Sequence, residues 1–226
     1  LLTKGLSLKK NLLLTMSQKL KENLHNHMNN YSLSKKLSIT SVAGPCLAKD
    51  LANKAKTCVL FANEKFNDAK KIRNFVKTNY YDIECSKNRK DIEICAAIKN
   101  FYSMIIGSAK DLNTSSFLFH KSVLEMKKVL KLWGNSENIA FGLAGLADLH
   151  VSSAGGRNSK MGKLLGKGYL YSKAKSKFMQ NETVEGAELA FELAPKILNS
   201  YTKKNLPLMY SLVKSIYHNT RLNIKF

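Results

Sequence analysis

The stretch FLFHKSVLEMKKVLKLW, residues 117–133, is the clearest structural signal in this chain of 226 residues. Its large apolar side chains recur every three or four positions, at Phe119, Val123, Met126, Leu130 and Trp133. That spacing gathers them on one face of an α-helix and leaves the intervening lysines on the other face. The stretch therefore predicts an amphipathic helix that packs against an apolar core.

The same helical period extends over much of the chain. Similar apolar spacing occurs in residues 8–24, 47–59, 62–78, 91–106, 137–150, 183–199 and 206–220. Strand signals are weak, because there is no long alternating run and no Asn-Gly or Asp-Gly pair that would mark a hairpin. We therefore predict an all-α fold, with a single helical domain of about seven to nine helices.

The domain organisation follows from where the helical pattern stops. Residues 1–24 read as a basic amphipathic helix or arm, because Leu8, Leu12 and Met16 recur every four residues among lysines. Residues 25–45 are rich in Asn, Ser and His and are interpreted as a linker, and residues 46–226 as the helical domain. For the last helix, Pro207 suits the first turn and Asn205 the N-cap.

The four cysteines lie within one segment, at Cys46, Cys58, Cys85 and Cys95. Helical spacing separates Cys46 from Cys58 and Cys85 from Cys95 too widely for local disulfides. Nested pairs, Cys46 with Cys95 and Cys58 with Cys85, would fit an antiparallel helical hairpin over residues 46–100. Such disulfides would favour an oxidising compartment and secretion. Four reduced cysteines are the alternative, and their spacing does not indicate a zinc site.

The charge is the most unusual feature of the composition. Lysine and arginine number 37 against 16 acidic residues, a formal net charge of +21. A balance this basic indicates a negatively charged partner, such as nucleic acid, an acidic polysaccharide or an anionic lipid surface. The basic residues concentrate in residues 1–49, 157–177 and 196–226, which suggests an arranged binding surface.

We predict polyanion contacts at two of these stretches. The segment after Gly155-Gly156 combines backbone N–H groups, bases and aromatic rings, as a groove for single-stranded nucleic acid does. Its predicted contact residues are Arg157, Lys160, Lys163, Lys167, Tyr169, Tyr171, Lys173, Lys175 and Lys177. A second arm would contribute Lys4, Lys9, Lys10, Lys19 and Lys21. A mobile loop followed by a core-facing helix is the alternative interpretation of the glycine-rich segment.

No catalytic motif is evident, so we predict a protein that is not an enzyme, with no catalytic residues, metal or cofactor. The glycine-rich segment departs from a P-loop, since five residues separate Gly156 from Gly162 and Leu164 replaces the magnesium-binding Ser or Thr. Glu182, Glu185, Glu188 and Glu192 follow helical spacing and are interpreted as an exposed acidic face.

Three functions remain open at this level. Sequence-tolerant RNA or other nucleic-acid binding comes first, for example in a capsid- or nucleocapsid-like protein that forms homo-oligomers. The second is a secreted, disulfide-linked helical protein that binds a glycosaminoglycan, a lipid or a receptor. The third is a membrane-surface protein that uses the N-terminal amphipathic helix.

One resemblance bears on the third function. The segment from Leu206-Pro207 to Asn219-Thr220 resembles part of the last helix of amphiphysin-type BAR domains, which would imply membrane binding. The resemblance is limited to this segment. The glycines between residues 155 and 168 oppose the long helices of such a domain, because each costs a helix about 1 kcal/mol relative to alanine.

Overall fold

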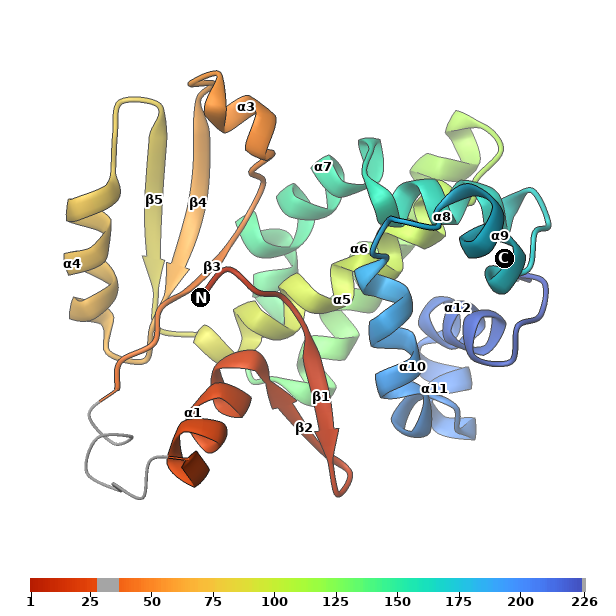
Figure 1. Ribbon diagram of the computed structural model, residues 1–226, viewed down its shortest axis with the longest axis horizontal. Helices are drawn as coiled ribbons and strands as arrows, with labels where there is room; N and C mark the ends of the chain where they lie inside the picture. Colours follow the sequence, from red (N-terminus) through yellow and green to blue (C-terminus); the bar gives the residue numbers. More distant parts are fainter. Residues whose placement is uncertain (28–36, 225–226) are drawn as a thin grey trace.

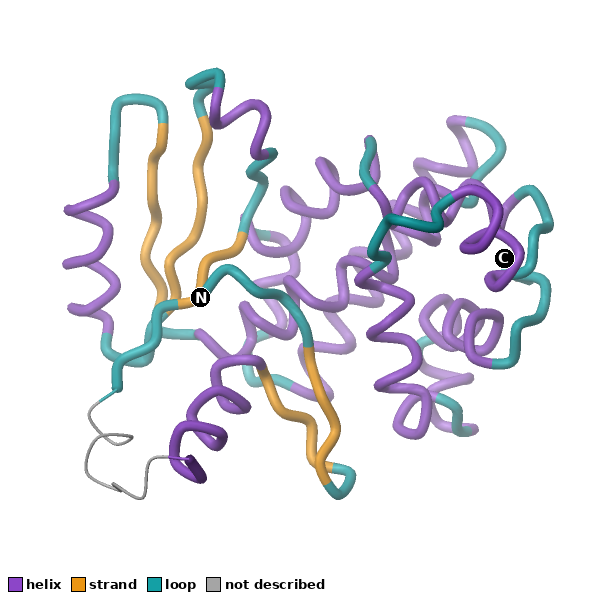
Figure 2. Tube along the Cα trace, in the orientation of Figure 1, coloured by secondary structure: helices purple, strands orange, loops and turns teal. Residues whose placement is uncertain are grey.

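A computed structural model describes residues 1–27 and 37–224 and places a small α/β region beside a larger helical region (Figure 1). The strands lie together in the first part of the chain, and helices make up the rest (Figure 2). The first part contains β1 (Leu6–Lys9), β2 (Leu12–Thr15), α1 (Met16–His27), β3 (Ser41–Ala43), α3 (Ala48–Ala52), β4 (Thr57–Ala62), α4 (Phe66–Val76) and β5 (Tyr81–Ser86).

The helical part begins with the long helices α5 (Arg89–Gly107) and α6 (Leu112–Trp133). A short 3₁₀ helix, Glu137–Phe141, and a π-helical turn, Leu143–Ala147, lead into α7 (Asp148–Ala154). The chain then forms α8 (Arg157–Gly166), α9 (Tyr171–Phe178), α10 (Glu185–Ile197), α11 (Ser200–Asn205) and α12 (Pro207–Tyr217). The helices expected near residues 62–78, 91–106, 117–133, 183–199 and 206–220 are therefore present, with shifted ends.

The predicted all-α fold is wrong, because residues 57–86 form a β-α-β unit. Strands β4 and β5 are parallel and joined through α4, and β3 pairs antiparallel with β4. The sequence of β4, TCVLFA, is a short, largely apolar run. A buried strand of this kind does not alternate polar and apolar residues, so its periodicity does not distinguish it from a helix. The expected helical hairpin over residues 46–100 does not form.

The helix expected over residues 8–24 begins only at Met16. Before it, β1 and β2 form a hairpin whose turn residues, Lys10 and Asn11, have positive φ angles of 49° and 65°. Asparagine tolerates this conformation better than most residues, which explains a tight turn without glycine. Residues 28–36 of the expected linker lie outside the described residues, and the boundary between arm, linker and helical domain stays a prediction.

Helix α5 is the centre of the helical part. Nearly all of its residues are buried, and it packs against α6, α7, α8, α10 and α12 (Figure 1). The core therefore forms around a helix that is covered on every side, as in the interior of a larger α-helical domain. Among its fully buried side chains are Ile94, Ile98, Phe101, Tyr102 and Ile105.

Helices α5 and α8 approach so closely that their backbones touch. A Cβ atom added to Gly162 would collide with the carbonyl oxygen of Met104, and one added to Gly166 would collide with that of Ser108. These glycines are four residues apart and therefore lie on one face of α8. The glycine-rich segment is thus a helix-packing surface, which holds the middle and the end of α8 against α5.

The N-terminus of α12 is capped from a distant helix. Pro207 occupies its first turn as expected, but Asn205 belongs to α11 and does not cap. Instead the carboxylate of Glu125, on α6, accepts hydrogen bonds from the backbone N–H groups of Leu208 and Met209, at 3.0 and 2.8 Å. A cap of this kind leaves no local signal in the sequence.

All four cysteines are free, so the expected disulfides are wrong. On the parallel strands, Cys58 lies opposite Asp82 and Cys85 opposite Phe61. The two cysteines are offset by three positions, which corresponds to about 10 Å along the strands. A disulfide needs Cα atoms closer than about 7 Å. Cys95 is fully buried in α5, whereas Cys46 is exposed before α3.

Candidate active site

A cavity of about 450 Å³ lies where the N-terminal segment meets the helical region. Its walls come from residues far apart in the sequence: the segment before β1, helix α5, helix α7 and the loop and first turn of α8. It is lined by Leu2, Thr3, Lys4, Leu47, Lys99, Asn100, Ser152, Gly155, Gly156, Arg157, Asn158 and Glu185. Most of the polar residues in this set are connected to one another by hydrogen bonds or ion pairs.

Lys99 is the central charged group of this cavity, and it is only 5% exposed. Its ammonium group forms an ion pair with the carboxylate of Asp148, which is also buried. The other carboxylate oxygen of Asp148 pairs with Lys4 at 2.9 Å. A buried charge is tolerated when it is paired and hydrogen-bonded, and this arrangement meets both conditions.

The environment of Lys99 prepares it for proton transfer. Burial lowers the pKa of Lys99 to about 8; the Asp148 carboxylate opposes this shift, and the positive charge of Lys4 adds to it. An amine with a pKa near neutrality exchanges a proton with a bound substrate far more readily than an ordinary lysine. The lowered pKa and the adjoining cavity together indicate an acid–base role.

The position of the Lys99 ammonium is fixed by helix α7. Its Nζ donates to the hydroxyl oxygen of Ser152 at 2.6 Å, and the Ser103 hydroxyl donates to the backbone carbonyl of Ser152 at 2.7 Å. Asp148 begins the same helix, one turn before Ser152. An ammonium group has three N–H donors, so these two partners leave one donor for a ligand in the cavity.

Asn158 joins three helices at the floor of the cavity. Its side-chain Nδ2 donates to Asn100 Oδ1 at 3.1 Å and to Glu185 Oε2 at 3.3 Å. Its Oδ1 accepts from the backbone N–H of Gly186 at 3.0 Å. Because Asn100 follows Lys99 on α5, this network ties the starts of α8 and α10 to the residue next to the buried lysine.

Arg157 places a positive charge at the mouth of the cavity. It is the first residue of α8, it is half-exposed, and its guanidinium pairs with Glu185. Gly156 precedes it with φ +96°, a conformation that favours glycine, and space is open around both Gly155 and Gly156. Free backbone N–H groups at a helix start, together with a guanidinium, suit an anionic group such as a phosphate.

The structure does not gather the expected polyanion-binding residues into one groove. On β1 and α1, Lys9 pairs with Glu22 and Lys21 with Glu64, at 2.8 and 3.6 Å. Lys10 lies in the hairpin turn and Lys19 is exposed on α1. Of the expected residues, the structure places Lys4 and Arg157 in the cavity described above.

Helices α8 and α9 hold the remaining expected residues. Lys160 pairs with Glu182, and Lys175 donates to the backbone carbonyls of Met179 and Gln180 at the end of α9. Tyr169 packs edge-to-face on Phe178 and Tyr171 on Phe191, so both rings face neighbouring side chains. Exposed and spread along the two helices are Lys163, Lys167, Lys173 and Lys177.

The described residues give no support for a metal centre or a membrane span. Among residues 1–27 and 37–224 there is no group of three or more His, Cys, Asp and Glu side chains placed to hold a metal ion. Within the same part of the chain, no helix combines the length and apolar character needed to cross a membrane.

Residues 90–224 match the protein family described as "NAD-dependent glycerol-3-phosphate dehydrogenase C-terminus". The chain belongs to this dehydrogenase family. The matched segment runs from the start of α5 to the end of the described chain and includes Lys99, Asp148 and Arg157.

Individual curated relatives of this chain are also glycerol-3-phosphate dehydrogenases. An NADP(+)-dependent glycerol-3-phosphate dehydrogenase from Archaeoglobus fulgidus is 30% identical over 196 residues, which cover 80% of this chain and 57% of the relative. A glycerol-3-phosphate dehydrogenase [NAD(P)+] from Clostridium botulinum is 28% identical and covers 80% of this chain and 54% of its own. The chain thus spans somewhat more than half the length of these relatives.

Solved structures show the same fold. Glycerol-3-phosphate dehydrogenase from Saccharomyces cerevisiae superposes with a TM-score of 0.80 at 17% identity, over 98% of this chain and 64% of that one. The enzyme from Plasmodium falciparum gives a TM-score of 0.78 at 20% identity, over 100% of this chain and 65% of that one. The chain therefore has the helical domain of an α/β dehydrogenase.

Membership of this dehydrogenase family overturns the functions predicted from composition. A non-enzymatic polyanion-binding protein is wrong, since the relatives and structural neighbours are dehydrogenases. RNA binding, a disulfide-linked secreted protein and an anionic polymer or surface as partner likewise have no support. The resemblance of residues 206–220 to a BAR domain was misleading, because α12 packs within this helical domain against α5 and α10.

The sequence did contain one signal for the site that charge counting missed. Lys99 and Asn100 stand inside the run IEICAAIKNFYSMII, residues 92–106, in the middle of an otherwise apolar helix. A lysine in a helix that is apolar all round must be buried, and buried lysines are usually paired and functional. Asp148 gives a similar signal as an acid after the small apolar run LAGLA, residues 143–147.

Proposed function

We propose that this chain supplies the substrate-binding and proton-transfer part of a glycerol-3-phosphate dehydrogenase. The relatives carry that name, and the chain spans a little over half of their length. The observation that carries the proposal is the buried Lys99–Asp148 ion pair, which opens into a cavity with Arg157 at its mouth. A polyol phosphate needs these two elements, one for the reacting hydroxyl and one for the phosphate.

Lys99 would transfer the proton of the reacting oxygen. When a secondary alcohol is oxidised to a ketone, its hydroxyl group loses a proton, which the neutral amine of Lys99 accepts. In the reverse direction, the ammonium returns that proton to the oxygen. Asp148 holds the side chain in place, and Ser152 accepts a second N–H. The pKa of about 8 lets both protonation states exist near neutral pH.

Arg157 and the start of α8 would bind the phosphate of the substrate. The guanidinium offers two parallel N–H donors, and the first backbone N–H groups of α8 have no partner within the helix. Arg157 pairs with Glu185, a contact that a doubly charged phosphate would replace. The open space around Gly155 and Gly156 lets the phosphate approach the backbone.

The names of the relatives imply NAD or NADP, a carrier of hydride. The described residues do not fit the phosphate groups of such a dinucleotide, which bind a Gly-x-Gly-x-x-Gly turn between a strand and a helix. The connections from β3 to α3, β4 to α4 and β5 to α5 contain one glycine, Gly44. The proposal therefore assigns substrate binding and proton transfer, and no dinucleotide step, to these residues.

Calorimetric titration of the purified chain with glycerol 3-phosphate tests the proposal. We expect glycerol 3-phosphate to bind more tightly than either glycerol or inorganic phosphate. Arg157→Ala should weaken binding about tenfold, and Arg157→Lys should restore part of it, since lysine keeps the charge but not the paired donors. Lys173→Ala is the matched control and should change nothing. Equal binding of inorganic phosphate, or an Arg157→Ala variant that binds normally, would contradict the proposal.

A further inference from the structure

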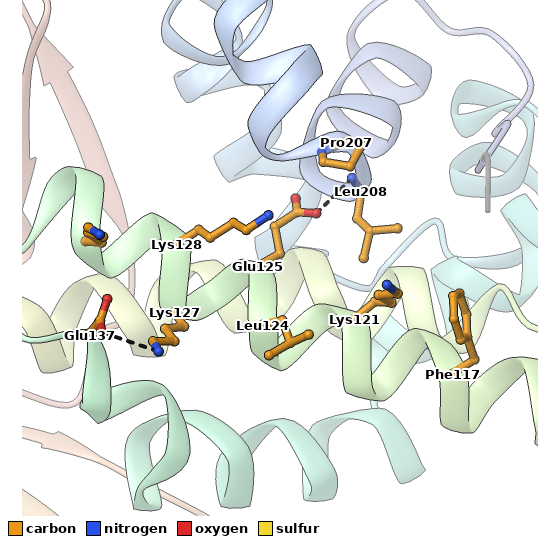
Figure 3. A pocket seen from close by; sticks show the side chains of 10 residues that line it. Phe117, Lys121, Leu124, Glu125, Lys127, Lys128, Glu137, Pro207 and Leu208 are labelled. Atoms are coloured by element: carbon orange, nitrogen blue, oxygen red, sulfur yellow. Dashed lines mark hydrogen bonds and ion pairs between the residues drawn. The ribbon is translucent and has the colours of Figure 1, made fainter.

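A second cavity, of about 550 Å³, lies in the helical region and shares no residue with the first. It is formed by the outer face of α6 and the start of α12 (Figure 3). The lining residues are Phe117, Lys121, Leu124, Glu125, Lys127, Lys128, Lys131, Glu137, Pro207 and Leu208. Its volume is that of a site for a small molecule, since such sites range from about 300 to 1,000 Å³.

One wall of this α6–α12 cavity is apolar, whereas six of its ten lining residues are charged. Leu124 is 37% exposed and Phe117 40%, although both are large hydrophobic residues. Pro207 and Leu208 face them from the first turn of α12 (Figure 3). Exposed apolar side chains that gather around a hollow favour a ligand with an apolar body.

The rim of the cavity is positively charged. Lys121 and Lys128 lie on either side of Glu125 along α6 (Figure 3). Lys131, which also lines the cavity, follows Lys128 by three positions on the same helix. Among the ion pairs of the described residues, none joins these three lysines to a carboxylate, whereas Lys127 pairs with Glu137 at 3.3 Å. The rim therefore offers cations that protein carboxylates have not neutralised.

Glu125 does not make the cavity a cation site. Its side chain is buried and its two oxygens accept the backbone N–H groups of Leu208 and Met209, while the Tyr102 hydroxyl lies 3.5 Å away. Burial raises its pKa to about 7, although the two backbone hydrogen bonds oppose the shift. The carboxylate is thus engaged in holding α12, and the three lysines determine the charge that a ligand meets.

We propose that the α6–α12 cavity binds a free amphipathic anion with one apolar chain, such as a medium-chain carboxylate. The chain of the ligand lies against Phe117, Leu124 and Leu208. The carboxylate head contacts Lys128 and Lys131, which adjoin the apolar wall. The proposed site is separate from the Lys99 cavity and does not depend on the function proposed for it.

Titration calorimetry with decanoate, below its micelle-forming concentration, tests the site. We expect one molecule of decanoate to bind per chain, and decyltrimethylammonium, which has the same chain with a cationic head, to bind at least about tenfold more weakly. The double variant Lys128→Gln/Lys131→Gln should lose about tenfold in affinity for decanoate. The matched double variant Lys173→Gln/Lys177→Gln, on α9, should bind like the original protein, and circular dichroism should show that both variants fold.

Three results would overturn the proposal. One is the absence of decanoate binding, and another is equal binding of the cationic analogue. The third is an equal affinity in the two double variants, which would point to a non-specific apolar surface. Co-sedimentation with phosphatidylglycerol vesicles distinguishes binding to a membrane surface from binding of a free anion. If the protein co-sediments with vesicles but does not bind decanoate, this face recognises a membrane instead. Leu124→Asn should weaken decanoate binding without removing any charge, which tests the apolar wall.

Discussion

Helix α5 and the pair of helices α8 and α9 all carry lysines, but in opposite surroundings. Lys99 on α5 is buried, paired with Asp148 and directed into a cavity. Lys163, Lys173 and Lys177 on α8 and α9 are exposed. An exposed charge interacts through water and contributes little, whereas a buried charge depends on its partners and has a perturbed pKa. One buried lysine is therefore a better guide to the function of this chain than its net charge of +21.

The largest effect expected from this contrast is on stability when Lys99 is removed. Lys99→Met leaves the buried Asp148 carboxylate with Lys4 as its ion partner and the Ser152 hydroxyl as a donor, so the free energy of unfolding should fall by about 3 kcal/mol. Urea denaturation at neutral pH measures the change. Lys163→Met, the matched exposed variant, should stay close to the original protein.

A second variant separates the loss of an ion pair from the loss of packing. The double variant Lys99→Met/Asp148→Asn also removes the charge of the buried carboxylate, so most of the lost stability should return. Lys4 then faces the cavity without a carboxylate, but it is partly exposed and can reach water. If the double variant is no more stable than Lys99→Met, the ion pair does not determine the stability of this region.

The next effect concerns the buried carboxyl of Glu125. Its pKa in the folded chain is about 7, above the ordinary value of 4.5, because burial disfavours the charged form. Between these values the folded chain keeps a proton that the unfolded chain has lost. The contribution of Glu125 is therefore complete below pH 4.5 and is lost as the pH rises to about 7, by about 3 kcal/mol at most.

The measurement is the difference in unfolding free energy between pH 5 and pH 8, in the original protein and in Glu125→Gln. Glutamine does not titrate, so the variant should lose less stability over this range. Glu137→Gln, which changes an exposed carboxylate of the same cavity, is the control and should behave like the original protein. A pH dependence that Glu125→Gln leaves unaltered would show that this carboxyl does not titrate abnormally.

Two glycines, Gly155 before α8 and Gly162 within it, differ in the same way in how closely other atoms surround them. Gly162 has no room for a side chain because the α5 backbone lies against it, whereas a Cβ atom added to Gly155, whose φ is −171°, would meet no other atom within 4 Å. Gly162→Ala should destabilise the protein by about 2 kcal/mol through overpacking, and Gly155→Ala should change its stability little. Thermal unfolding of the two variants is the test. Equal melting temperatures would mean that α5 and α8 do not need backbone contact.

The helices of the C-terminal part could be predicted from sequence because long amphipathic patterns persist there. Strand β4 could not, since a six-residue, largely apolar strand has the same character as one side of a helix. Strand β5 does alternate apolar and acidic residues, from Tyr81 to Cys85, but a run of five positions is too short to stand out in a chain with helical periods. The cap of α12 also could not be predicted, because Glu125 lies more than 80 positions before the N–H groups that it binds. Contacts of this kind depend on the tertiary fold and leave no local pattern.

The site was hidden for a different physical reason. Lys4, Lys99, Asp148 and Arg157 come together only when the N-terminal segment, α5, α7 and α8 pack, so no short motif contains them. Of these residues, Lys4 and Arg157 were among those expected to bind an anion, and both were assigned to an anionic polymer or surface. The isolated lysine inside the apolar pattern of α5 was the available signal. Lys99 is one of 37 basic residues, so a count of charges cannot distinguish it from the others.

The smallest expected effect concerns the exposed lysines of α9, which are compared above with the buried Lys99. Lys173→Ala/Lys177→Ala removes two charges from α9, and the free energy of unfolding should change by less than about 0.5 kcal/mol. Raising the salt concentration should change this difference little, because neither lysine has an ion partner among the described residues. A large change in the free energy of unfolding that depends on salt would mean that the exposed lysines act together through a shared electrostatic potential. In that case the distinction between one buried lysine and many exposed ones would be too simple for this molecule.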